Sequence, residues 1–135
     1  MSSDPAAYVS AVQVNLFCED VEAVTRFYDA LGFPRVFAVP AEGPPEHVEL
    51  DVAGTRIGLT SVEAANRIAD LGVVAPVAAG SEVVLWCRDA DELFRAALGA
   101  GATALVPPRD SPDGRIRYGW VRDPEGHQLK FVTPL

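Results

Sequence analysis

Alternating apolar and polar residues predict several short strands in this chain, and stretches with helical spacing lie between them. Residues 9–18 alternate between an apolar face and a mixed face, as a half-buried strand does. Asp20 then provides a helix cap, apolar residues recur at helical spacing, and Gly32 predicts the end of that helix. The following segments are predicted as strands at 33–39, 48–52 and 56–60 and a short helix at 61–71.

The second half of the chain repeats this order of elements. The turn at 123–126 matches the turn at 51–54 at an offset of 72 residues, and residues 82–89 match 13–20 at an offset of 69. The predicted elements of this half are a strand from residue 82, a helix at 90–98, a strand at 103–106, a loop at 107–114, and strands at 115–122 and 128–132. The predicted fold class is therefore α+β: two tandem βαβββ modules, residues 9–72 and 81–133, joined by a linker at 73–80 within a single domain, 1–135.

Each module is too small for a core of its own, so we expect the apolar strand faces to pack with both helices. The other faces would form a curled mixed sheet around a cleft that takes ligands. Period-2 counting directs the following residues to the cleft: Gln13, Asn15, Phe17, His47, Glu49, Asp51, Arg56, Gly58, Thr60, Glu82, Val84, Trp86, Gln128, Lys130 and Val132. Tyr118 and Trp120 are left unassigned, because they cannot both face the cleft if Val121 does.

Composition narrows the classes of function. At 135 residues and 49% hydrophobic content, the chain is long enough to bury a sizeable core. Its net charge of −8 and the lack of a basic run argue against nucleic acid and anionic membranes as partners. With no apolar run near the ~20 residues of a membrane span, we expect a cytoplasmic protein. Cys18 and Cys87 lie in apolar segments, where free thiols are more common than a disulfide.

Three stretches of the sequence resemble the vicinal-oxygen-chelate superfamily, which includes glyoxalase I, extradiol dioxygenases, fosfomycin-resistance transferases and bleomycin-binding proteins. They are the strand and Asp20-capped helix that ends at residues 27–33, the similar start at Asp89, and the closing turn at 123–127. The resemblance covers about residues 10–133 and implies the two-module fold. It is specific for the fold and weak for function, because this scaffold hosts many reactions.

The resemblance also implies where metal ligands would lie. The metal-dependent members hold their metal through four strand positions, which carried onto this sequence are Gln13, Gly58, Glu82 and Lys130. Gly58 has no side chain, and the Lys130 ammonium would repel a divalent cation. Two ligands are too few for a metal site, so we expect no metal and no cofactor.

Several of these residues have two interpretations that the sequence leaves open. Lys130 pairs with Glu82 either to present a positive charge to a ligand oxygen or as a plain structural ion pair. Trp86 and Phe17 either stack on a flat ligand or simply fill the cleft. The acidic residues Glu49, Asp51 and Glu82 either attract a cationic drug or form a solvated rim. His47 and His127 show no carboxylate partner at an evident spacing, which favours surface or turn roles over general base catalysis.

The main functional hypothesis is a metal-free protein that binds a small, partly aromatic molecule, neutral or cationic, with antibiotic sequestration as one role. Its expected ligand-binding residues are Gln13, Asn15, Phe17, His47, Glu49, Arg56, Glu82, Trp86 and Lys130. A second hypothesis is a lyase, isomerase or dioxygenase-like enzyme that uses Glu82 and Lys130 as catalytic residues on a small carbonyl or enol compound. A third is a metalloenzyme with His47 or Glu49 as a ligand. By analogy with the family we expect a homodimer.

Overall fold

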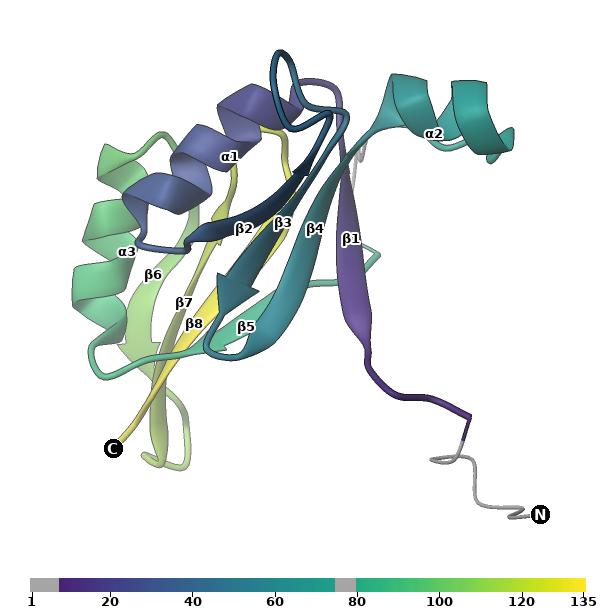
Figure 1. Cartoon of the computed structure of the whole chain (residues 1–135). Coiled ribbons are helices and arrows are strands. Elements are labelled where there is room, and N and C mark those ends of the chain that lie inside the picture. The colour runs from purple at the N-terminus through teal and green to yellow at the C-terminus, as the bar shows by residue number, and fades with distance from the viewer. Residues whose placement is uncertain (1–7, 75–79) are drawn as a thin grey trace.

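The computed structural model describes residues 8–74 and 80–135 (Figure 1). Residues 1–7 and the centre of the predicted linker, residues 75–79, lie outside the described residues. In chain order the elements are β1 (Gln13–Cys18), α1 (Val21–Ala30), β2 (Arg35–Val39), β3 (His47–Val52), β4 (Thr55–Ser61), α2 (Val62–Ala69), β5 (Val83–Trp86), α3 (Ala90–Gly99), β6 (Thr103–Asp110), β7 (Ile116–Arg122) and β8 (Gln128–Pro134).

The strands form two four-stranded mixed sheets with the same topology. The first has the order β1-β4-β3-β2 and the second the order β5-β8-β7-β6. In each sheet the first strand pairs in parallel with the fourth, and the remaining pairs are antiparallel. The predicted α+β fold of two tandem modules is therefore confirmed, with the two sheets remaining separate rather than closing into a barrel.

One hydrophobic core joins both modules. α1 packs on β3 and β4, and α3 packs on β6, β7 and β8. Phe27 of α1, Phe94 of α3, Leu59 of β4 and Phe131 of β8 belong to the same buried cluster. The expected packing of the apolar strand faces with both helices in one shared core is confirmed. Because the helices cover one face of each sheet, the opposite face of each is available for a ligand.

The repeated sequence signals produce repeated local structure. The side chains of Asp20 and Asp89 accept hydrogen bonds from the backbone N–H groups three residues on, at 3.0 Å in both cases, and so cap α1 and α3. Gly54 and Gly126, which match at the offset of 72, have φ values of 86° and 94°. Both turns need a left-handed residue at this point, which glycine adopts without strain.

β6 is longer than the sequence pattern predicts. The prediction of a loop from residue 107 is wrong, because β6 continues through Pro107 and Pro108 to Asp110. The pairing register shifts between Val106 and Arg109, so the two prolines fall in an irregular part of the ladder. β6 also lies at the edge of its sheet, where proline is tolerated since only one side needs backbone N–H donors.

The closing turn of the second module, residues 123–127, binds the first module through a buried carboxylate. Asp123 accepts hydrogen bonds from Tyr28 Oη at 2.8 Å and from His127 Nδ1 at 2.7 Å. The other ring nitrogen of His127 lies 2.9 Å from the Phe17 carbonyl oxygen. The prediction that His127 lacks a carboxylate partner is wrong, because the partner is the turn residue four positions earlier. Its role in the turn is structural.

Glu125 adds a second link between the modules. Its carboxylate accepts hydrogen bonds from the backbone N–H groups of Glu19 and Asp20, at 2.6 and 2.7 Å. These groups precede α1, where the helix dipole favours a negative charge. The closing turn thus fixes the second module against the start of α1.

None of the helices among the described residues is long and apolar enough to cross a membrane.

Candidate functional site

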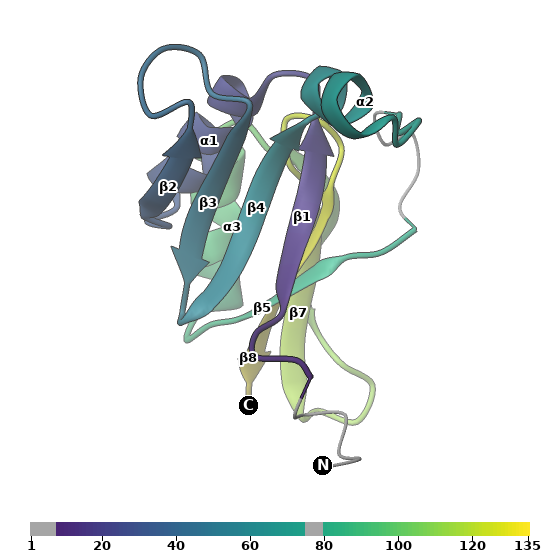
Figure 2. The ribbon, with the colours of Figure 1, turned by 45° about the vertical axis from the view of Figure 1, so that its right-hand side comes forward.

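The open face of the first sheet carries the side chains that period-2 counting directs to the cleft. The strand register aligns Phe17 with Thr60 and Thr60 with His47, and it aligns Gly58 with both Asn15 and Glu49. Residues that alternate along a strand share a face, so the predicted facing of these positions is confirmed. Figure 2 shows this sheet with β2, β3, β4 and β1 side by side.

Glu49 lies at the centre of a polar network on this face. Its carboxylate accepts hydrogen bonds from Arg56 Nη1 at 2.7 Å, His47 Nε2 at 3.0 Å and Gln13 Nε2 at 3.3 Å. The hydrogen bonds from His47 and then Arg56 lower the pKa of this carboxyl below its usual value, so it is ionised at neutral pH. His47 therefore has a carboxylate partner two residues along β3, which corrects the sequence-based expectation.

The network lies over Gly58, whose missing side chain makes room for it. A Cβ atom at this position would lie 2.1 Å from Asn15 Oδ1 and 2.9 Å from both Gln13 Nε2 and His47 Cε1. Three side chains thus converge above one glycine. Sequence reasoning noted Gly58 as a missing metal ligand, whereas the structure shows that its neighbours fill the space that a side chain would need.

A cavity of about 360 Å³ lies between this face and α2. Its polar floor includes Asn15, Thr60 and His47, with Phe17 and Val39 beside them. Its other wall is the apolar side of α2 and the residues after it, formed by Ala64, Ala65, Ile68, Ala69 and Leu71. Figure 2 shows α2 at the end of the sheet where β1 and β4 finish. The cavity size is typical of sites for small organic molecules.

The α2 wall is the part of the site that sequence reasoning missed. Ser61 caps α2 through a 3.0 Å hydrogen bond from Ala64 N, and Asp70 ends it in the left-handed conformation. Ile68 and Leu71 remain 69% and 58% exposed although they are large and apolar. Exposed apolar side chains on a cavity wall would gain by covering a ligand. The helical spacing of Ile68 with the buried Ala64 and Ala65 was the available signal.

The open face of the second sheet has a different character. The Lys130 ammonium lies 5.3 Å from the ring centre of Tyr118 and 5.4 Å from that of Trp120, and the two rings lie 4.8 Å apart. The register aligns Lys130 with Trp120 and Val132 with Tyr118. Both aromatic residues therefore face this side, while Val121 lies in the core. The facing of β7, which the sequence left open, is thus settled.

Glu82 contacts other residues than the one expected. Its two carboxylate oxygens accept hydrogen bonds from Gln128 Nε2 at 3.0 Å and Trp120 Nε1 at 3.4 Å. Within residues 8–74 and 80–135 no ion pair joins Glu82 to Lys130, so the expected pair is not formed. Lys130 instead makes cation–π contacts, which satisfy an ammonium without a carboxylate.

The expected ligand-binding residues thus fall into two groups, one on each sheet. The first group is Gln13, Asn15, Phe17, His47, Glu49 and Arg56, and the second is Glu82, Trp86 and Lys130. In the part of the chain that the structure describes, no hydrogen bond or ion pair links the two groups. Three members, Asn15, Phe17 and His47, line the α2 cavity, whereas Gln13 and Arg56 line a separate opening near the start of β1. Trp86 is 66% exposed on the second sheet.

The donor set does not fit the metal that the fold family implies. Of the four carried-over positions, Gly58 is covered by its neighbours' side chains and Lys130 presents a cation. Across the described residues, no group of three or more His, Cys, Asp or Glu side chains is arranged to hold a metal ion. His47 and Glu49 lie together, but the Glu49 carboxylate already accepts hydrogen bonds from Arg56 and Gln13. The four carried-over positions therefore do not form the metal site that the resemblance implies.

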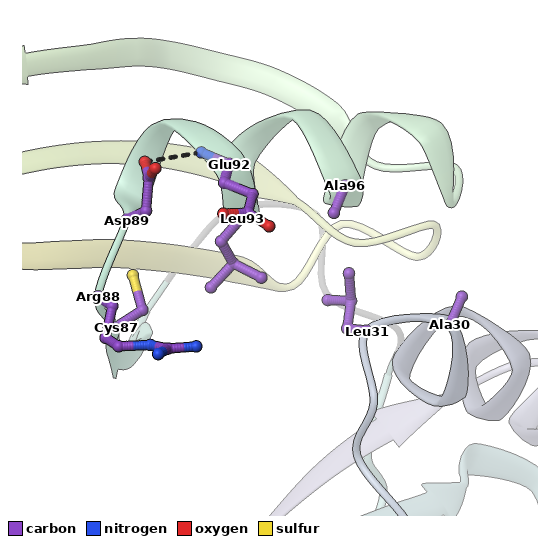
Figure 3. Close-up of a pocket in the computed structure, with 8 residues that line it drawn as sticks. All are labelled: Ala30, Leu31, Cys87, Arg88, Asp89, Glu92, Leu93 and Ala96. Carbon is purple, nitrogen blue, oxygen red and sulfur yellow. Dashed lines mark hydrogen bonds between the residues drawn. The ribbon is translucent and has the colours of Figure 1, made fainter.

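Another cavity, of about 320 Å³, lies where the end of α1 meets the start of α3 (Figure 3). Its lining includes Cys87, Arg88 and Asp89. The Cys87 thiol donates to the Val132 carbonyl oxygen at 3.5 Å, and Asp89 caps α3 through the Glu92 N–H. These polar groups already serve the packing of α3, so the α2 cavity is the better candidate site. Both Cys18 and Cys87 are free, as the sequence predicts.

Comparison with known proteins places this geometry in context. TioX from Micromonospora sp. ML1 is 29% identical with a TM-score of 0.71, over 94% of this chain and 100% of that one. FosX, a genomically encoded fosfomycin resistance protein from Listeria monocytogenes, is 12% identical with a TM-score of 0.71, over 94% of each chain. Lactoylglutathione lyase from Agrobacterium tumefaciens is 20% identical with a TM-score of 0.64, over 93% of this chain and 94% of that one.

The last two similarities, at 12% and 20% identity, show the fold alone. None of the curated proteins matches the sequence significantly. The family model of the Glyoxalase/Bleomycin resistance protein/Dioxygenase superfamily matches residues 10–131, which includes both modules. Together with the two sheets of identical topology, this match shows that the chain belongs to the Glyoxalase/Bleomycin resistance protein/Dioxygenase superfamily.

Proposed function

We propose that this protein binds a small, partly aromatic molecule in the α2 cavity without a metal. The observation that carries the proposal is the pairing of an apolar wall with a polar floor in one cavity. Ligand sites of this kind take most of their affinity from apolar contact and their orientation from a few polar groups. Ile68 and Leu71 would cover a flat ligand, and the floor residues Asn15 and Thr60 would orient it.

The charges around the cavity favour a neutral ligand over a cationic one. Glu46 also lines the cavity, but its carboxylate pairs with Arg67 of α2. Glu49 pairs with Arg56 and His47 on the sheet. Since the nearby carboxylates have basic partners, a ligand cation would gain little from them. Sequestration of an antibiotic inside the cell is one role that such binding would serve.

The enzymatic alternative receives less support from the geometry. It requires Glu82 and Lys130 to act as a pair on a carbonyl or enol compound, whereas each has other partners in this chain. Two similar structures carry different names, a fosfomycin resistance protein and a lactoylglutathione lyase, and both similarities are below 25% identity. A binding role needs only the cavity, so it is the function that we propose.

A thermal-shift screen against neutral aromatic compounds tests this proposal, because a ligand that binds only the folded state raises Tm. Ile68→Lys places a charge on the exposed cavity wall and is expected to abolish the shift without unfolding the protein. Leu98→Lys on α3, also a partly exposed apolar residue, is the matched control and should keep the shift. A ligand that shifts wild type and Ile68→Lys equally binds elsewhere and would contradict the assignment.

A further inference from the structure

We infer that Arg67 is a positioning residue of the α2 cavity: its ion pair with Glu46 holds the α2 wall against the first sheet, so that ionic strength sets how fast a ligand leaves. The inference rests on the proposed function, because it concerns the regulation of the same cavity. Arg67 is not one of the residues that line the cavity, whereas Glu46 is. Arg67 therefore acts through the wall and not by touching the ligand.

Packing alone holds α2 weakly. The helix packs on β4, and only Ala64 and Ala65 of its eight residues are buried. Two alanine methyl groups remove little apolar surface from water, and Ile68 is 69% exposed. Helices with few buried apolar contacts open locally at a low cost in free energy. The position of α2 at the cavity therefore depends on its polar contacts.

The α2 wall behaves as one piece because Asn66 joins the helix to the residues after it. Asn66 Nδ2 donates to the Val73 carbonyl oxygen at 2.9 Å, and the Val73 N–H donates to Asn66 Oδ1 at 2.8 Å. The Asp70 N–H also donates to the Asn66 carbonyl oxygen at 3.1 Å. Leu71 lies inside this closed loop, so a movement of the helix carries Leu71 and Ile68 together.

Glu46 provides the point on the sheet to which Arg67 attaches this wall. Arg67 Nη2 donates a hydrogen bond to the Glu46 carboxylate. The Glu46 backbone is itself fixed on both sides, since its N–H donates to the Val39 carbonyl oxygen at 2.7 Å and its carbonyl oxygen accepts from the Ser61 N–H at 2.8 Å. Val39 ends β2, and Ser61 ends β4 and caps α2. The ion pair thus joins the interior of α2 to a fixed part of the first sheet.

The ion pair is exposed, which makes it weak and sensitive to salt. The side chains of Arg67 and Glu46 are 50% and 39% exposed. An exposed pair changes a local opening equilibrium by roughly two- to five-fold, and salt screens it. Apolar contacts with a neutral ligand carry no charge for salt to screen, so a release rate that rises with NaCl reports the ion pair. Arg67 also pairs with Glu63 at 2.7 Å within α2, a contact that does not tie the helix to the sheet.

Stopped-flow release of N-phenyl-1-naphthylamine, a neutral aromatic compound that fluoresces in apolar sites, tests the inference. At about 20 mM NaCl we expect Arg67→Met to release it roughly two- to five-fold faster than wild type does. At about 0.5 M NaCl wild type should approach the rate of the variant, which itself should stay nearly constant. Glu63→Gln is the matched control and should keep the wild-type rate, because it removes the other partner of the same arginine. Adding Glu46→Gln to Arg67→Met should speed release no further.

Amide hydrogen exchange of α2 in the ligand-free protein is the second measurement. Arg67→Met should speed exchange at residues 66–69 by about the same factor, and Glu63→Gln should not. The inference is overturned if Arg67→Met leaves either rate unchanged or if Glu63→Gln raises both equally. The binding function survives that result when Ile68→Lys still abolishes binding of the compound. If wild type does not bind the compound, the wider screen decides the function of the cavity and the exchange measurement alone decides the inference.

Discussion

His127 Nε2 lies 2.9 Å from the backbone carbonyl oxygen of Phe17, so a residue of the second module holds the strand that lines the α2 cavity. His127 Nδ1 faces Asp123 at the same time. Both neighbours are acceptors, and only the imidazolium form can donate to both. Burial disfavours the charged ring, but the hydrogen bond and charge of Asp123 together with the Phe17 carbonyl raise the pKa of His127 above its usual value.

We predict from this contact that stability falls as pH rises above about 6.5, the ordinary pKa of histidine. The pKa of His127 in the folded state is above its unfolded value near 6.5. The contribution of the charged ring to the free energy of unfolding is therefore complete below pH 6.5 and is lost as pH rises through the folded-state pKa. The loss of one buried hydrogen bond amounts to about 1 kcal/mol of unfolding free energy. Urea unfolding of wild type and His127→Gln across this range measures the difference between them.

Other groups that titrate near this turn limit the useful pH window. Asp123 and Glu125 act on His127 directly, and the same acids act on Tyr28 of α1 and on Cys18 of β1. Burial raises the pKa of the Cys18 thiol and of the Tyr28 hydroxyl, and their neighbouring acids raise them further. These shifts also reduce stability with rising pH, but only above about pH 8.5. A pH slope below 8 that is the same in both proteins would refute the assignment to His127.

Gly58→Ala should disturb the cavity floor much more than the fold. The new Cβ would collide with the ends of the Asn15, Gln13 and His47 side chains, which can move away while the backbone stays in place. We expect a stability loss of no more than about 1–2 kcal/mol and a loss of ligand binding. Thermal melts and the Asn15 side-chain amide signals in NMR spectra measure these two effects.

Gly99→Ala is the matched control, because a Cβ there meets nothing within 4 Å and no positive φ is involved. This variant should keep both the amide signals and binding. If Gly58→Ala left the Asn15 amide signals in place, the crowding above Gly58 would not exist in solution.

The exposed apolar residues of the second sheet lead to a prediction about Trp86 and self-association. Trp86 and Val84 are 66% and 42% exposed on the same face. Trp86→Ala should cost the isolated chain well under the ~3–5 kcal/mol that a core aromatic such as Phe131 would cost. We also expect wild type to be a homodimer, with light scattering giving twice the 14.4 kDa chain mass. A mass of one chain at micromolar concentration would rule out the dimer.

Divalent metals should leave the stability of the purified protein unchanged. The motivation is the donor set, in which Gly58 offers no ligand and Lys130 is a cation over two aromatic rings. We expect no rise in Tm with Ni²⁺, Zn²⁺ or Mn²⁺, because only a metal that binds the folded state would raise it. Elemental analysis gives an independent check, and about one metal per chain after mild purification would disprove the prediction.

The sequence predicts the faces of the strands well because their alternation has a physical cause. Successive side chains of a strand point to opposite faces of its sheet. Because Leu59 and Phe131 face the core, their neighbours Gly58 and Lys130 must face the other side. The helix caps at Asp20 and Asp89 follow from local hydrogen bonding and are equally readable. Local rules of this kind do not depend on how the two modules pack.

The partners within each face are less predictable because they depend on side-chain reach. Lys130 is aligned with Trp120, and its ammonium lies over aromatic rings that sequence spacing did not bring together. The cavity itself depends on where α2 lies after Ser61, which is a property of tertiary packing. The extension of β6 through Pro107 was missed since proline normally signals a loop, and only the register shift accommodates it.

α2 lies in the connection between the two repeats, which has consequences for how this protein can evolve. The duplicated units supply the sheets and the shared core, whereas the cavity wall comes from the segment that joins them. Natural selection can therefore vary positions 68 and 71 to suit a different molecule while the ancestral repeats keep the chain folded. A family built in this way can diversify its ligands through α2 and the residues after it, and comparison of close homologues should show faster substitution there than in β1 or β4.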